Sequence, residues 1–314
     1  MIRSFAEVEK AAYEVGPKKA SVLRAENREF LLALKEACRR GYIEPILIGN
    51  ESEIRKIADE IEFDIGSFQL IDENDPQEIA DRGVNLVSTG DAQFVFRGHI
   101  EGHFLYRALI RSSSNSEINT QVCAVSLIYL PVLSKLIGMT DGGVAIAPDF
   151  QSKIEIIRNT VDLFSHLGYD NPRVGVLTAE RGLNPELDSV RDTVKIKEAL
   201  ANGELKGCSI EDGLSISDFL FGRDGFLEES DKIDFSLIPD IFLVHNVEFG
   251  NIFSKIDSLS AEDYFSGWER HGIITGAGIP TVVPSRADKH NTIVTDIALG
   301  VLIAREEEAT GNDA

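Results

Sequence analysis

The chain has 314 residues, of which 43% are hydrophobic, and its formal net charge at pH 7 is −21. This length exceeds one typical core, so we expect one large or two medium α/β domains. The negative charge argues against binding to nucleic acid or to an anionic membrane surface. An anionic small molecule would therefore need local basic residues to attract it.

Three cysteines, Cys38, Cys123 and Cys208, lie within helix or strand patterns and have no paired spacing, as is typical of reduced thiols in the cytoplasm. The first 19 residues contain acidic residues throughout and lack the apolar centre of a signal peptide. The longest apolar stretch, 122–139, is interrupted by a proline and a lysine. We therefore expect a cytoplasmic protein without a membrane partner.

Strands and helices alternate in the first part of the chain. Asn27 opens a helix with one apolar face, and Gly41 ends it. Asn50 and Glu53 resemble a capping box at the start of the next helix. The expected elements are strands at 20–23, 45–49, 68–71 and 93–96, and helices at 27–40, 50–61, 76–88 and 101–110.

The residues Arg97, Gly98 and His99 follow the fourth of these strands. A basic residue beside a glycine suits an anion, because glycine lets the backbone approach the ligand, although a plain turn would have the same pattern. His99 and His103 have the spacing of metal ligands on one helix face, but no third ligand is near in the sequence, so we expect no metal site.

A second series of strands and helices begins near residue 138, where we place a domain change. The alternation predicts a mostly parallel sheet with helices on both faces, and each strand ends in polar or charged residues. Two further strands are expected before this change, at 121–129 and 132–139. The elements expected after it are strands at 173–178, 206–210 and 240–244, and helices at 150–167, 188–202, 251–256 and 293–303.

The stretch 276–288 combines a glycine turn, a β-branched strand and a polar strand end before the last helix. In an open parallel sheet, the carboxyl ends of the strands and the amino ends of the following helices face the ligand. Ser285, Arg286 and Asp288 therefore predict an anion site in which Arg286 grips oxygens with its guanidinium fork. An ordinary surface arginine capped by Asp288 is the alternative.

Other recognisable machinery is absent from the sequence. It contains no Walker lysine loop, dinucleotide fingerprint, nucleophile elbow or paired-cysteine metal site. We therefore expect chemistry without a tightly bound cofactor.

Taken together, the strand ends resemble those of the phosphate acetyl/butyryltransferase family. The matching segments occur in family order over nearly the whole chain: 41–49, 97–98, 140–141 with 146–149, 179–180 with 184–185, 212–213 with Asp218, Glu248 with 250–251 and Lys255, and 285–288. The resemblance implies two doubly wound α/β domains with a cleft between them, as in isocitrate and isopropylmalate dehydrogenases. It also implies a homodimer. We expect the first domain to comprise residues 1–137 and 285–314, and the second 138–284.

The reaction that the resemblance implies is transfer of an acyl group between coenzyme A and inorganic phosphate, without metal and with coenzyme A as a substrate. Arg286 and Ser285 would hold phosphate, and Arg97 would lie close to the acyl or phosphate oxygens. His245, as a base or a ligand, and Asp288 complete the expected catalytic residues. The expected substrate-binding residues are Arg97, Gly98, His99, Asp141, Glu180, Asp212, Glu248 and Asn251.

The chain also departs from the family pattern, since it lacks polar family residues at several positions and carries additional histidines. The replaced positions are Gly102, Cys123, Ala124, Ala145, Pro284 and Thr292, and the added histidines are His99, His103 and His245. Two alternatives therefore stay open. One is metal-dependent or dehydrogenase-like chemistry on a small anionic substrate, and the other is binding of an acyl-CoA or an anion without turnover.

Overall fold

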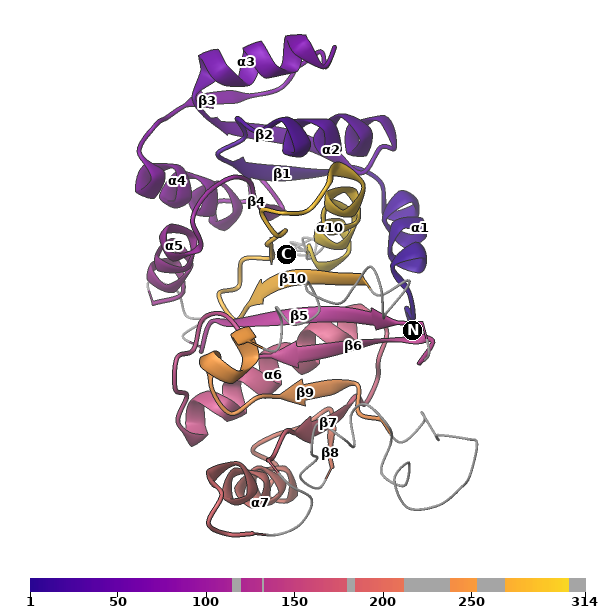
Figure 1. Cartoon of the computed structure of the whole chain (residues 1–314), viewed down its shortest axis with the longest axis vertical. Helices are drawn as coiled ribbons and strands as arrows, with labels where there is room; N and C mark the ends of the chain where they lie inside the picture. The colour runs from indigo at the N-terminus through magenta and orange to yellow at the C-terminus, as the bar shows by residue number, and fades with distance from the viewer. Residues whose placement is uncertain (115–119, 132, 180–183, 212–237, 253–268, 305–314) are drawn as a thin grey trace, which may run out of the picture. The chain divides into compact units, whose positions relative to one another are not determined.

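The computed structural model describes residues 1–114, 120–131, 133–179, 184–211, 238–252 and 269–304, and it shows a mixed α/β chain (Figure 1). Contacts divide the chain into two compact units. Ala6–Ser116 and Gly278–Ala314 form what we call the N-terminal unit, and Met1–Phe5 with Glu117–Ala277 form the middle unit. The contacts thus group residues 117–137 with the middle unit, whereas the division expected from the sequence placed them in the first domain.

The N-terminal unit contains a sheet in which every pair of strands is parallel, with the order β3-β2-β1-β4-β11. The expected alternation of strands and helices is confirmed for this part of the chain. Its strands are β1 (Lys18–Leu23), β2 (Ile43–Gly49), β3 (Leu70–Asp72), β4 (Phe94–Arg97) and β11 (Thr281–Val282). Its helices are α1 (Phe5–Val15), α2 (Arg28–Arg39), α3 (Glu51–Glu60), α4 (Pro76–Ser88), α5 (Gly102–Ser114) and α10 (His290–Ile303).

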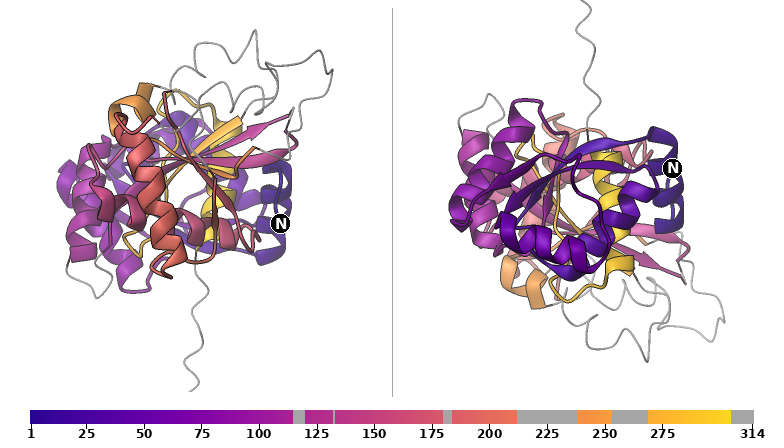
Figure 2. Two further views of the ribbon diagram at one scale, coloured as in Figure 1. Left: turned by 90° about the horizontal axis from the view of Figure 1, so that it is seen from below. Right: turned by 90° about the horizontal axis from the view of Figure 1, so that it is seen from above.

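Helices cover both faces of this sheet (Figure 2). On one face α10 approaches β4 so closely that a Cβ on Gly300 would lie 2.3 Å from Phe94 Cε2. On the other face α4 approaches β1, where a Cβ on Gly83 would lie 2.0 Å from Leu23 Cδ2. Leu23 pairs with Arg97 and therefore shares its face, opposite to that of Phe94.

Asparagine caps begin two of the helices, as the sequence predicts. The Asn27 side chain accepts from Glu29 N and Phe30 N at the start of α2, and the Asn50 side chain accepts from Glu53 N at the start of α3. Helix α1 was not expected.

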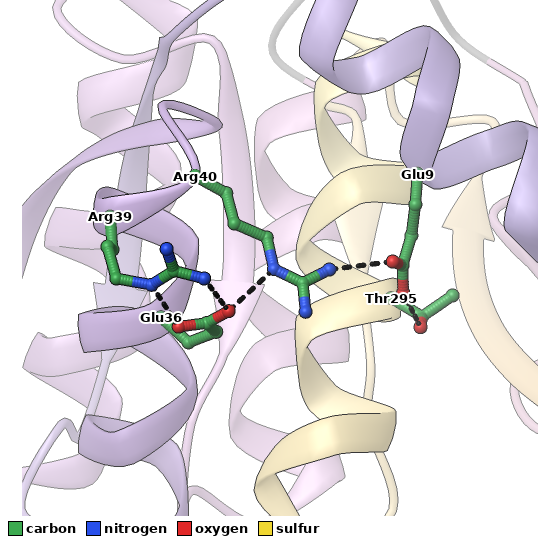
Figure 3. A network of polar contacts seen from close by, with 5 residues as sticks. All are labelled: Glu9, Glu36, Arg39, Arg40 and Thr295. Atoms are coloured by element: carbon green, nitrogen blue, oxygen red, sulfur yellow. Dashed lines mark hydrogen bonds and ion pairs between the residues drawn. The ribbon is translucent and has the colours of Figure 1, made fainter.

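A polar network joins α1 and α10 to α2 (Figure 3). Arg40, directly after α2, donates from Nε to Glu36 Oε1 and from Nη1 to Glu9 Oε2, each at 2.7 Å. Thr295 of α10 donates to the other oxygen of Glu9, also at 2.7 Å. Hydrogen bonds from Arg39 and Arg40 lower the pKa of Glu36 to about 2. Two consecutive helices and the distant helix α10 are thus linked through ionised groups.

The middle unit contains a mixed sheet with the order β10-β5-β6-β9-β7-β8. Strand β5 is antiparallel to both β6 and β10, and the remaining pairs are parallel. The sheet is therefore less parallel than expected, because β5 and β6 are joined by a connection too short for a parallel crossover. The elements are β5 (Cys123–Leu130), β6 (Lys135–Thr140), α6 (Phe150–His166), β7 (Arg173–Val176), α7 (Asp188–Ala201), β8 (Ser209–Ile210), β9 (Ile241–Leu243) and β10 (Glu269–Thr275).

Helix α6 packs against one face of the middle sheet, since a Cβ on Gly138 of β6 would lie 2.7 Å from Phe164 Cε2. The opposite face of β6 and β9 carries a buried cluster that includes Ile137, Met139 and Phe242. Packing on both faces holds β6 and β9 in position, and therefore also positions the residues that directly follow these strands.

All three cysteines are free thiols, and Cys123 and Cys208 are buried. Burial raises the pKa of Cys38 to about 12 and that of Cys208 to about 11. Within the described ranges, no helix is long and apolar enough to cross a membrane.

Candidate active site

Three neighbouring strands of the N-terminal unit end at one edge of its sheet. Strand β1 pairs with β4, and β4 pairs with β11, in parallel register, so that Leu23 lies beside Arg97 and Val282 beside Phe96. Because carboxyl ends of parallel strands meet at the same edge, Arg97 and the segment after Val282 belong to one edge, as the sequence predicts.

Arg97 is half-buried at the end of β4, and its Nε donates to Ile100 O at 2.9 Å. Burial lowers its pKa, the charge of Arg286 lowers it further, and Tyr106 acts in the opposite direction. Arg286 follows β11, the parallel neighbour of β4, so both arginines belong to the same edge of the sheet. Gly98 follows, and a Cβ there would lie 2.0 Å from Leu23 O, so only glycine allows this approach of the two strand ends.

Ser285 to Asp288 form a tight turn that precedes α10. The Ser285 amide donates to Asp288 Oδ2 at 2.7 Å, and the Asp288 amide donates to Ser285 O at 3.1 Å. The Ala287 amide donates to Ser285 Oγ at 3.3 Å. Asp288 therefore fixes the turn, and Arg286 at its tip is exposed.

Neither Arg97 nor Arg286 has a carboxylate partner in the part of the chain that the structure describes. Two guanidinium groups without counter-charges repel each other, and an anion between them would remove that repulsion. This edge therefore has the electrostatics of a site for a small dianion.

The histidines after β4 do not form a metal site within the described ranges. His99 is exposed, and His103 lies 3.3 Å from Glu101 Oε2 through Nδ1. Among the described residues, no group of three or more His, Cys, Asp or Glu side chains could hold a metal ion.

Two carboxylates near this edge were missed from the sequence. Glu26 lies 3.4 Å from Arg24 Nε through Oε1, and its Oε2 is buried without a hydrogen bond to the described residues. Glu29 of α2 accepts from His290 N at 2.9 Å, which lowers the pKa of Glu29 and anchors the start of α10. The partner of Glu29 could not have been read locally, because this contact connects α2 with α10, whereas Arg24 and Glu26 are only two residues apart.

In the middle unit, Asp141 follows β6 and is 2% exposed. Its carboxylate accepts from Gly143 N, Val144 N and Ala145 N at 2.7 to 3.0 Å. Burial raises the pKa of Asp141, and these backbone hydrogen bonds act against that rise. The carboxylate thus faces its own loop and organises the backbone of residues 141–145.

The loop after β6 packs directly on the segment after β9. A Cβ on Gly250 would lie 2.8 Å from Asp141 O, and Asn251 donates to Gly142 O at 3.2 Å. Helical residues begin at 247, earlier than expected, with Asn246 as the cap that accepts from Phe249 N. The predicted residue Glu248 lies exposed in this segment.

His245 meets two side chains that the sequence analysis did not single out. Lys153 of α6 donates to Asp192 Oδ2 of α7 at 2.5 Å, and its Nζ is 3.4 Å from His245 Nδ1. Burial and the Lys153 charge lower the pKa of His245, whereas Asp192 acts to raise it. The Lys153 side chain is only 6% exposed, and that of His245 is 37% exposed.

Two predicted substrate-binding residues, Glu180 and Asp212, lie outside the described residues. The structure therefore does not place them.

A family model described as phosphate acetyl/butaryl transferase matches residues 77–301, well over half of the chain. The chain belongs to this family. It is a phosphate acyltransferase, an enzyme that moves an acyl group between coenzyme A and inorganic phosphate.

Curated members of the family match over almost their full length. The chain is 28% identical to a phosphate butyryltransferase of Clostridium acetobutylicum over 304 residues, covering 97% of this chain and 99% of the relative. It is 26% identical to a phosphate acetyltransferase of Thermotoga maritima, with 91% and 95% covered.

Solved structures show a likeness of fold. A branched-chain phosphotransacylase from Enterococcus faecalis V583 matches with a TM-score of 0.71 and 21% identity, covering 91% of this chain and 98% of that one. A putative 4-hydroxythreonine-4-phosphate dehydrogenase from Salmonella typhimurium matches with a TM-score of 0.58 and 12% identity, covering 91% and 99%. The phosphate acyltransferase thus shares its mixed α/β architecture with a dehydrogenase.

Proposed function

We propose that this phosphate acyltransferase holds inorganic phosphate, and the phosphoryl group of the acyl phosphate, with Arg97 and Arg286. The observation that supports this assignment is that two arginines without counter-charges among the described residues follow neighbouring parallel strands at one edge of the sheet. The Ser285 hydroxyl can add a donor at the same edge, and Asp288 keeps the turn in place.

The proposed reaction is a direct acyl transfer. A phosphate oxygen attacks the thioester carbonyl carbon, and the electron pair of the C=O bond moves to the carbonyl oxygen. When this tetrahedral intermediate collapses, the C–S bond breaks and the thiolate of coenzyme A leaves. The phosphate proton ends on that thiolate, so the products are an acyl phosphate and coenzyme A. Arg97, half-buried, is suited to stabilise the developing negative charge.

The remaining sequence-predicted residues belong to the same proposal. Gly98 allows the backbone approach beside Arg97, and Asp141 and Asn251 act by fixing the loop after β6. His99 and Glu248 are exposed and available to substrate. Glu180 and Asp212 are assigned to substrate binding on the family resemblance.

We assign a small acyl group, on the names of the butyryl and acetyl relatives, and coenzyme A as a substrate without a tightly bound cofactor. The two doubly wound domains with a cleft, the homodimer and the cytoplasmic location expected from the sequence also belong to the proposal. The unpaired cysteines support the cytoplasmic location.

The test measures thiol release from acetyl-, butyryl-, branched and dicarboxylic acyl-CoAs, with and without phosphate. We expect phosphate-dependent release for one or two of them. In Arg286→Ala we expect the KM for phosphate to rise about 100-fold, because a charge-assisted contact to the dianion is lost.

Arg55→Ala is the matched control, since Arg55 is an exposed arginine on α3 that pairs with Glu51. It should leave the KM for phosphate unchanged. An unchanged phosphate KM in Arg286→Ala would remove Arg286 from the site.

A further inference from the structure

Three side chains from separate elements of the middle unit meet beside the carboxyl end of β9. Lys153 comes from α6, Asp192 from α7, and His245 from the segment after β9. Lys153 Nζ lies 2.5 Å from Asp192 Oδ2 and 3.4 Å from His245 Nδ1. The distance from His245 Nδ1 to Asp192 Oδ2 is 3.8 Å, too long for a hydrogen bond.

The identity of the neighbour decides the tautomer of His245. A lysine ammonium has three N–H donors and no acceptor, so it cannot receive a proton from Nδ1. The Nδ1 atom must therefore be the acceptor and carry no hydrogen. A neutral imidazole has its single proton on the other nitrogen, so His245 carries it on Nε2.

The surroundings of His245 also favour the neutral ring. Among the described residues, the charged groups that act on it are Lys153 on α6 and Asp192 on α7, and burial adds to the effect of Lys153. Asp141, on the neighbouring loop, directs both its oxygens to backbone amides. The Asp192 carboxylate is engaged by Lys153, which limits its attraction for a proton on His245.

We infer that His245 acts in the acyl transfer as a neutral hydrogen-bond donor through Nε2–H, and not as a base. Lys153 is a positioning residue that fixes this tautomer, and Asp192 holds Lys153. The inference rests on the proposed function for its substrate. The tautomer follows from the contacts within the middle unit alone.

Chemistry supports a donor at this place. When phosphate attacks a thioester, it arrives as an anion and coenzyme A leaves as a thiolate, so the transition state gains negative charge on oxygen. A neutral N–H aimed at that oxygen stabilises it without giving up the proton. A base at His245 would instead need a free lone pair on Nε2, which the contact with Lys153 excludes.

The first test is nitrogen NMR of the full chain labelled at histidine, with the His245 signals identified by their loss in His245→Gln. At pH 7.5 we expect a protonated Nε2 and an unprotonated Nδ1. Lys153→Arg should retain this pattern, because arginine is also a donor without an acceptor. Lys153→Met should shift the population towards the Nδ1–H form.

The second test compares two substitutions of His245 in phosphate-dependent thiol release. The Gln side chain can donate through its amide but cannot act as a base, whereas Ala can do neither. We expect His245→Ala to lower kcat by about 100-fold and His245→Gln to lower it by less than about 10-fold.

The outcomes separate the possible failures. Equal losses in His245→Ala and His245→Gln, or an Nδ1–H form in the unmodified chain, would overturn the donor role. If the NMR spectrum shows a protonated Nε2 but no acyl-CoA releases thiol with phosphate, the tautomer assignment is retained and the proposed function is refuted.

Discussion

At the residue scale, the positive charges of Arg97 and Arg286 would attract an anion, but they repel each other when no anion is bound. Arg97 is half-buried, and the charge of Arg286 disfavours its ionised form. In Arg97→Met we therefore expect phosphate to lose its stabilising effect, while the melting temperature without phosphate is at least that of the unmodified protein.

This expectation is measured by thermal unfolding in phosphate and in chloride at equal ionic strength. Phosphate at 100 times its dissociation constant should stabilise the unmodified protein by about 2.7 kcal/mol. Arg82→Ala, which removes an exposed arginine paired with Glu73 on the same unit, should keep that response. A full phosphate response in Arg97→Met would place the anion elsewhere.

The sequence predicted the location of those candidate residues that directly follow a strand. Arg97 and Arg286 directly follow short strands, and parallel pairing brings such ends to one edge. Lys153 and Asp192 could not be predicted, because they lie 92 and 53 positions before His245 and their meeting depends on how three elements pack. Asp141 was recognised, but the turn of its carboxylate into its own loop follows from backbone geometry that residue types do not specify.

At the element scale, the link between α1, α2 and α10 depends on ionised Glu36. Its pKa is about 2 in the folded chain against 4.5 ordinarily, so the folded state binds the proton less tightly than the unfolded state. The stabilisation is therefore present above about pH 4.5 and is lost as the pH falls from there towards about 2. Because these side chains are partly exposed, we expect only about 1 kcal/mol from it.

Urea unfolding of Glu36→Gln and of the unmodified chain checks this pH dependence. The difference in unfolding free energy should be about 1 kcal/mol at pH 7 and should shrink as the pH falls below 4.5. Glu53→Gln is the control, since Glu53 is exposed and lies 3.8 Å from Lys56 Nζ in a loose ion pair. A difference that grows on acidification would contradict the assignment.

Two helix starts with explicit sequence signals were predicted well. Asn27 and Asn50 mark helix starts because their side chains satisfy free backbone amides. Helix α1 was missed, although Ser4 and Glu7 have the spacing of a capping box at its start. The antiparallel direction of β5 relative to β6 could have been predicted, because the connection between them is too short for a parallel crossover. Its pairing with β10 could not, because that strand is distant in sequence.

At the scale of the whole molecule, the net charge of −21 opposes the approach of anionic substrates. The Debye length is about 30 Å at 0.01 M salt and about 10 Å at 0.1 M, so added salt screens the distant acidic residues first. We expect kcat/KM for acyl-CoA to rise as a salt with a bulky anion is raised from about 0.01 M to about 0.1 M. A steady fall over this range would mean that local basic residues already control the encounter.

The thiol chemistry of the chain has a practical consequence for labelling. Thiol reagents attack the thiolate, and the pKa values of Cys38 and Cys208, about 12 and about 11, keep those sulfurs protonated near neutral pH. Burial raises the pKa of Cys123 as well. A single cysteine introduced at an exposed position would thus react far faster than the native three, so a fluorescent or spin probe could be attached without first removing them.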